Sequence, residues 1–265
     1  MQWEAQPLID SHCHLDFEIF DDQRQRLLSQ CADLDIDGII IPGIEPVQWQ
    51  KLQRLTAIQS GDCRLWAACG VHPWWLPDVE PCKTDYGQRF DHQIAQTSMI
   101  AIGECGLDGA IATPIEHQLP WFEWHLQRAC DLQLPLIVHA HRAHNDVIRM
   151  LSRYRPTAGG VIHGFSGSVE MALQYWQLGF YIGVGGTITY ERAAKTRRAV
   201  SQLPLESLLL ETDAPDMPLQ GFQGQSNSPL QLPEVAKSLA HLRNEPLSEL
   251  KQVISTNTRQ LFKLG

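Results

Sequence analysis

Eight short apolar, β-rich runs recur along the chain, and stretches with helical periodicity separate them. The runs are Leu8–Asp10, Gly38–Pro42, Leu65–Gly70, Met99–Gly103, Leu136–His139, Gly160–His163, Tyr181–Gly185 and Leu208–Glu211. The helical stretches include Asp22–Leu34, Val47–Gln59, Gln118–Leu132, Asn145–Arg153, Val169–Leu178 and Ala193–Leu203. Apolar strands that alternate with helices are typical of a parallel β/α architecture. Eight such repeats in roughly 250 residues predict a (β/α)8 TIM barrel.

The domain organisation follows from the same pattern. The chain has 265 residues, 43% of them hydrophobic, with no linker-like or low-complexity break, so we expect a single domain over residues 1–265. A doubly wound open sheet is the competing fold, but it usually has fewer strands, and no G-x-G-x-x-G follows the first run. The tail from Leu230 to Phe262 predicts two further helices that cover the barrel.

Charge and cysteine content limit the classes of function. The net charge of −9 argues against a broad basic surface for long duplexes, although metal cations can supply positive charge locally for a phosphate substrate. The seven scattered cysteines form no zinc-finger spacing, which favours reduced thiols. We find no apolar run that would span a membrane and no signal segment, and so expect a cytoplasmic protein without membrane contact.

Ionisable side chains follow the apolar runs at one end. They are Asp10, His12 and His14 after the first run, His72 after the third, Glu104 after the fourth, His139 and His163 at the fifth and sixth, and Asp213 after the eighth. The carboxyl ends of barrel strands converge on one face, where active sites are found. Taken one at a time, these residues have ordinary explanations as exposed carboxylates or hydrogen-bonded histidines.

The pair His12 and His14 is the sharpest local feature. Residues at i and i+2 of a strand project from the same face, so both imidazoles can reach one ion. An isolated His-x-His pair also arises by accident, but its place after the first run favours a metal site. Asp10 lies one step back on that face, and we expect it to orient an imidazole.

The whole set indicates two divalent metal ions. Carboxylates and desolvated imidazoles crowded at one rim would be unfavourable unless cations compensate. Mixed His and carboxylate ligands suit Zn²⁺ or Mn²⁺, with Mg²⁺ as an alternative if water completes the shell. Six candidate ligands exceed one tetrahedral site. We therefore expect two ions bridged by Glu104.

The sequence resembles the TatD family of metal-dependent deoxyribonucleases, which are amidohydrolase-like barrels. The matching segments are residues 10–14, 70–73, 103–108, 163–167 and 211–215, and the stretches 182–197 and 216–227 resemble its YjjV-type branch. The resemblance implies that His12, His14 and Asp213 bind one ion, that His139 and His163 bind the other, and that Glu104 bridges them. His72 and Asp108 match motif positions near the site. The chain departs from the family at His141, where Arg is common, and at residues 109–112, where aromatic residues are common.

The expected function is hydrolysis of phosphodiester bonds in DNA or a small phosphodiester by a metal-bridging hydroxide. Asp213 would orient the water and accept its proton, and His72, His141 and Arg142 are candidate phosphate contacts. The alternatives are a metal-dependent amidohydrolase or esterase that acts on a small metabolite, and a non-enzymatic, metal-containing protein that binds a partner. The oligomeric state stays open, with a monomer as one expectation.

We interpret two further surface features. Trp74, Trp75 and Phe222 either stack nucleobases or pack against the barrel rim. The stretch 190–198 is the most basic segment of the chain, and we interpret it as the solvated face of the seventh helix.

Overall fold

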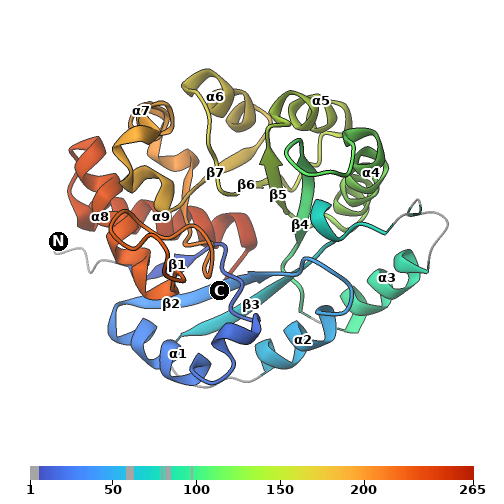
Figure 1. Ribbon diagram of the computed structural model, residues 1–265, viewed down its shortest axis with the longest axis horizontal. Helices are drawn as coiled ribbons and strands as arrows, with labels where there is room; N and C mark the ends of the chain where they lie inside the picture. The colour runs from blue at the N-terminus through green and yellow to red at the C-terminus, as the bar shows by residue number, and fades with distance from the viewer. Residues whose placement is uncertain (1–5, 58–62, 78, 80, 82–84, 97) are drawn as a thin grey trace.

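A computed structural model describes residues 6–57, 63–77, 79, 81, 85–96 and 98–265. It contains one sheet of eight parallel strands in the order β1 to β8, with helices on its outer side (Figure 1). This confirms the predicted (β/α)8 barrel. The strands are β1 (Leu8–Asp10), β2 (Ile36–Pro42), β3 (Arg64–Cys69), β4 (Ala101–Asp108), β5 (Leu136–His141), β6 (Gly160–Ile162), β7 (Phe180–Val184) and β8 (Leu208–Leu210).

The connecting helices follow the predicted stretches, with one addition. Helix α3, which links β3 to β4, was not predicted. The α-helices are α1 (Arg24–Asp33), α2 (Trp49–Ala57), α3 (Tyr86–Gln96), α4 (Ile115–Leu132), α5 (His144–Tyr154), α6 (Val169–Gln177), α7 (Ala194–Gln202), α8 (Leu232–Arg243) and α9 (Leu247–Phe262). Single turns of 3-10 helix are η1 (Glu18–Phe20), η2 (Pro73–Trp75), η4 (Gly186–Thr189), η5 (Glu191–Ala193), η6 (Leu205–Ser207) and η7 (Pro229–Gln231).

The first and last strands meet just beyond the sheet pairing. The Ser11 amide donates to the Leu210 carbonyl at 2.9 Å, and the Asp213 amide donates to the His12 carbonyl at 2.9 Å. These bonds bring the segment after β1 beside the segment after β8. Residues about 200 positions apart in sequence therefore become neighbours at the carboxyl end of the barrel.

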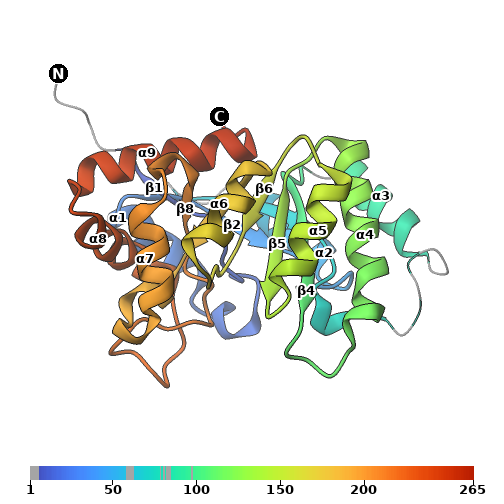
Figure 2. The same ribbon diagram turned by 90° about the horizontal axis from the view of Figure 1, so that it is seen from above.

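Helix α9 closes the opposite end of the barrel. Its Leu261 and Phe262 pack with a buried apolar cluster from the strands. That cluster comprises Ile9, Ile40, Ala68, Ala101, Ile137, Val161 and Leu209. In Figure 2, α9 lies along one end of the barrel, and the long connections after β4 and β8 lie at the other. With one end filled by apolar side chains, the carboxyl end is left for polar chemistry.

Two further sequence expectations concern membranes and thiols. Among the described residues, no helix combines the length and the apolar character that crossing a bilayer requires. Six cysteines are free, and all of these except Cys130 are buried. Cys82 lies outside the described residues.

Candidate metal centre

Glu104 lies inside β4, not at the end of a strand as the sequence predicted. In the pairing of β4 with β5, Ile102 faces Leu136 and Cys105 faces Val138, so β4 has one extra residue between these pairs. After this bulge the pairing continues to Asp108, which faces His141. Bulges bend a strand and redirect side chains, and they are frequent beside active sites. The strand ends expected at Gly103 and His139 are therefore wrong, because β4 continues to Asp108 and β5 to His141.

Five imidazole nitrogens surround the Glu104 carboxylate, which is only 2% exposed. Three lie near Oε1 and two near Oε2. From Oε1, the distances are 2.7 Å to His163 Nε2, 3.2 Å to His72 Nε2 and 3.2 Å to His139 Nδ1. From Oε2, they are 3.2 Å to His12 Nε2 and 3.6 Å to His14 Nε2. The carboxylate thus lies at the centre of the cluster.

Asp213 approaches the same imidazoles from the segment after β8. Its Oδ1 lies 3.4 Å from His12 Nε2 and 3.7 Å from His14 Nε2. The residue has a φ of 57°, a left-handed conformation that Asp tolerates better than most side chains. All six predicted metal ligands therefore gather at the carboxyl end of the barrel.

The electrostatics of the cluster are strongly perturbed. Burial raises the pKa of Asp213 well above its usual value, and burial lowers the pKa of His14 to about 4. Burial also opposes charge on His163, but the adjacent Glu104 carboxylate outweighs it and raises the pKa of His163 to about 10. Burial opposes charge on Glu104 as well, yet the surrounding imidazoles, His163 foremost, hold its pKa well below the usual range.

The donor atoms fit divalent metal ions. Within the part of the chain that the structure describes, four groups each bring three ligand atoms within 4.8 Å of one another: His12, His14 and Glu104; His72, Glu104 and His139; His12, His163 and Asp213; and Asp108, His139 and His141. Among the described residues, the buried Nδ1 atoms of His12, His14 and His163 have no hydrogen-bond partner. Imidazole and carboxylate donors together suit zinc and manganese. Glu104 belongs to two of these groups.

His72 lies among these candidate ligands. It was expected to contact a substrate phosphate, but its side chain is buried and its Nε2 faces Glu104. Its Nδ1 accepts a hydrogen bond from the Trp74 amide at 3.1 Å, which holds the start of η2. His72 is thus placed to act as a ligand to a metal ion, while its role toward substrate stays a prediction.

Asp108 contacts the ring nitrogen of His139 that is not the one next to Glu104. Its Oδ2 lies 3.1 Å from His139 Nε2 and accepts a 2.8 Å hydrogen bond from the Trp74 indole. Its own backbone is fixed by the Gln118 side chain, which bonds to both the Asp108 amide and carbonyl. A carboxylate behind a metal-binding histidine fixes the orientation of its ring. The sequence contained no motif that would identify Gln118.

Asp10 and Glu211 hold backbone segments near the ligands. The Asp10 carboxylate accepts from the amides of His12 and Thr212 and, at 2.5 Å, from the Thr212 hydroxyl. It therefore fixes the backbone and does not orient an imidazole as expected. Glu211 Oε1 accepts from the Gly164 amide at 2.5 Å, beside His163, and burial raises the pKa of Glu211 to about 7.

The remaining candidate substrate contacts lie at the exposed rim. The His141 side chain is 53% exposed, with Nδ1 at 3.4 Å from Asp108 Oδ1, and Arg142 beside it is exposed. In the basic stretch, Arg197 donates to the Ile188 carbonyl and Arg192 lies over the Tyr190 ring. Both arginines thus contact nearby residues, which favours the interpretation of this stretch as part of the surface around α7.

Comparison with known proteins places the whole chain in one family. The family model described as TatD related DNase matches residues 9–263. The metal-dependent hydrolase YjjV of Escherichia coli is 40% identical over 97% of this chain and 98% of its own length. The crystal structure of that protein superposes with a TM-score of 0.89, covering 98% of this chain and 100% of the other. A 3'-5' ssDNA/RNA exonuclease TatD of Pantoea vagans is 30% identical over 93% of this chain and 95% of its own length.

The similarity extends over nearly the full barrel, including every strand that carries a candidate ligand. The fold, the histidine and carboxylate cluster and the family match agree with one another. The chain belongs to the TatD family of metal-dependent hydrolases.

Proposed function

We propose that this protein is a nuclease that hydrolyses phosphodiester bonds with two divalent metal ions held at the carboxyl end of the barrel. The observation that carries the proposal is the Glu104 carboxylate, whose two oxygens face different imidazole groups. A carboxylate shared in this way suits a bridge between two ions. His12, His14 and Asp213 would hold one ion, and His139 and His163 the other, with His72 beside Glu104.

The proposed chemistry assigns separate tasks to the two carboxylates. Bound divalent cations would lower the pKa of water and stabilise negative charge on phosphoryl oxygens. Glu104 is enclosed by imidazoles and would hold the ions in place. Asp213, at 9% exposure against 2% for Glu104, is the candidate that orients the attacking water and accepts its proton.

Nucleic acid is the proposed substrate class. The matched family model is described as a DNase, and the Pantoea relative is named for exonuclease action on single strands. The chain's net charge of −9 suits a site in which the cations, and not a basic surface, meet the phosphate. We place the protein in the cytoplasm, where reduced thiols persist.

The test combines metal content with hydrolysis. Purified protein is expected to carry about two divalent ions per chain and to cleave an end-labelled oligonucleotide with Mg²⁺, Mn²⁺ or Zn²⁺. Glu104→Gln should lose metal and at least roughly 100-fold in rate. Glu116→Gln, at an exposed position in the first turn of α4, is the matched control.

Two outcomes would contradict the proposal. One is phosphodiester hydrolysis that survives in Glu104→Gln with the metal content unchanged. The other is turnover of amide or lactone substrates by a wild-type protein that cleaves no phosphodiester, which would favour an amidohydrolase or esterase.

A further inference from the structure

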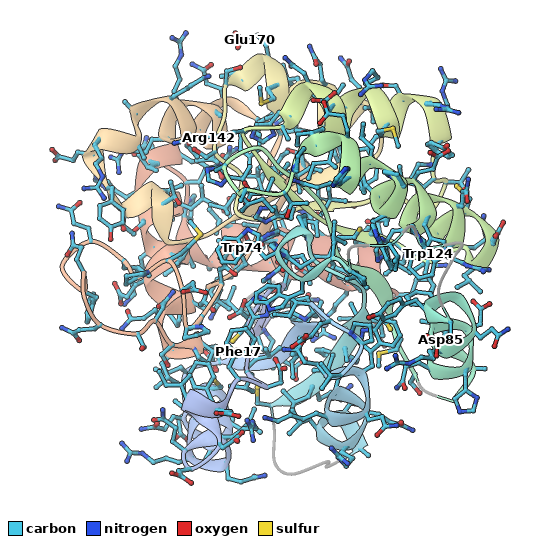
Figure 3. The ribbon with its side chains drawn as sticks, turned by 45° about the vertical axis from the view of Figure 1, so that its right-hand side comes forward. Phe17, Trp74, Asp85, Trp124, Arg142 and Glu170 are labelled. Carbon is cyan, nitrogen blue, oxygen red and sulfur yellow. The ribbon has the colours of Figure 1, made fainter. Side chains whose placement is uncertain are left out.

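Two adjacent tryptophans stand exposed beside the metal cluster. Trp74 is 58% exposed and Trp75 is 40% exposed, both in η2, directly after His72. Figure 3 places Trp74 near the centre of the view, between Phe17 and Arg142. A packed indole buries a large apolar surface, but most of the Trp74 side chain remains exposed. Packing against the barrel rim therefore does not explain a tryptophan at this position.

The Trp74 ring is exposed but held in place. Its Nε1 donates to Asp108 Oδ2 at 2.8 Å, and the same oxygen lies 3.1 Å from His139 Nε2. Its backbone amide donates to His72 Nδ1 at 3.1 Å. The indole is thus anchored to Asp108, which contacts His139, and the Trp74 backbone is anchored to His72. A ring fixed in this way loses little conformational freedom when a ligand stacks on it.

The rings of His72 and Trp75 do not stack face to face on the Trp74 ring. Trp74 and His72 meet edge to face, with centroids 5.5 Å apart and planes at 82°. Trp74 and Trp75 are 5.8 Å apart and tilted by 35°. Neither contact is a parallel stack that would cover the Trp74 ring face, and the 58% exposure of this side chain agrees.

We propose that Trp74 is the platform on which a nucleobase of the substrate stacks, next to the phosphodiester held at the metal cluster. This inference rests on the proposed nuclease function and adds a base-binding residue to it. Bases in a duplex are already stacked and paired, whereas an unpaired base can lay its face on an indole. The site should therefore prefer single strands that carry bases at the cleaved end.

Binding and hydrolysis are measured on three probes: a fluorescein-labelled single-stranded oligonucleotide, the same strand with abasic residues at the cleaved end, and its blunt duplex. Fluorescence anisotropy with phosphorothioate probes reports Kd without turnover. In the wild type, the base-bearing strand should bind roughly 5- to 150-fold more tightly than the abasic strand.

Three variants separate stacking from support of the cluster. Trp74→Ala should abolish most of the preference for the base-bearing strand. Trp74→Phe, which keeps an aromatic face but lacks the N–H, should restore most of it. Phe17→Leu is the matched control, because Phe17 is a half-buried ring stacked on His14 at 4.8 Å, and it should keep the preference.

The outcomes distinguish this inference from the proposed function. If Trp74→Ala weakens base-bearing and abasic strands equally, Trp74 acts only through Asp108 and the inference is wrong. Equal binding of base-bearing and abasic strands by the wild type also overturns it, as does Trp74-dependent binding of the duplex. If the base-dependent binding holds but no probe is cleaved with any metal, the nuclease proposal fails while the stacking site stands.

Discussion

Asp10 and Thr212 join the first and last strands of the barrel across 202 positions of sequence. Asp10 Oδ2 accepts from the Thr212 hydroxyl at 2.5 Å, and Oδ1 accepts from the Thr212 amide at 3.0 Å. Both residues are fully buried. The same carboxylate also accepts from the His12 amide at 3.2 Å, so one side chain both joins the two segments and fixes the backbone of the first candidate metal ligand.

Removing the Asp10 carboxylate should therefore destabilise the fold. Asp10→Ala leaves three buried donors without their acceptor, and we expect a loss of about 3 kcal/mol or more in the free energy of unfolding. Asp10→Asn keeps one carbonyl oxygen for the backbone amides and should lose less. Urea unfolding followed by circular dichroism measures both. Equal stability of Asp10→Ala and the wild type would refute the assigned role.

Asp108 should act on metal affinity through His139. The Asp108 Oδ2 atom lies next to His139 Nε2. Replacing the charged carboxylate with a neutral amide should therefore weaken the contact that orients the His139 ring. We expect Asp108→Asn to lower the affinity for the ion that His139 would hold roughly 10- to 100-fold. Isothermal titration of the metal-free protein with Mn²⁺ or Zn²⁺ gives the affinity. Asp146→Asn, in the first turn of α5, where Asp146 pairs with the exposed Arg149, should bind as the wild type does.

Gly183 makes room for the buried Glu211 carboxylate. A Cβ at this position would lie 2.4 Å from Glu211 Oε2, so the methyl group of Gly183→Ala displaces a side chain that holds the Gly164 amide. We expect a loss of about 1–3 kcal/mol, visible in urea unfolding. Gly87→Ala in α3 is the control, since the nearest atom lies 3.8 Å away, and it should be neutral or slightly stabilising. The prediction fails if the two variants are equally stable.

His125 should contribute to acid sensitivity. Burial lowers the pKa of His125 to about 4, while its Nε2 accepts from the Val71 amide and its Nδ1 pairs with the Trp121 carbonyl. An unfolded histidine titrates near 6.5, so the unfolded state binds the extra proton between pH 6.5 and 4. This contribution is fully present above pH 6.5 and is lost as the pH falls toward 4.

The measurement compares the wild type with His125→Gln, which cannot take up that proton. Between pH 7 and pH 5, the free energy of unfolding of the wild type should fall by about 2 kcal/mol more than that of the variant. Urea titrations at the two pH values give both differences. Parallel losses in the two proteins would show that His125 carries no linked proton.

The local pattern of apolar and polar residues was enough to predict much of the barrel architecture. The alternation of apolar runs with helical periodicity predicted all eight strands, because strands buried on both faces read as continuous apolar runs and helices bury one face only. The same reasoning located His12, His14, His163 and Asp213 just beyond the carboxyl ends of their strands, whereas His139, like Glu104, lies inside its strand. Helix α3 was missed, although it packs Phe90 against the rings of Trp49 and Trp124.

Other features were decided only by contacts between distant segments. A bulge in the pairing with β5 places Glu104 inside β4. Residues 101–108 alone contain no signal that predicts this bulge. Asp10 binds the backbone of Thr212 and not a ring because the last strand supplies those donors. Sequence therefore determined which residues have metal-binding chemistry and at which end of the barrel they lie. Tertiary structure decided which atoms face each other, because hydrogen-bond geometry between strands is set when the barrel closes.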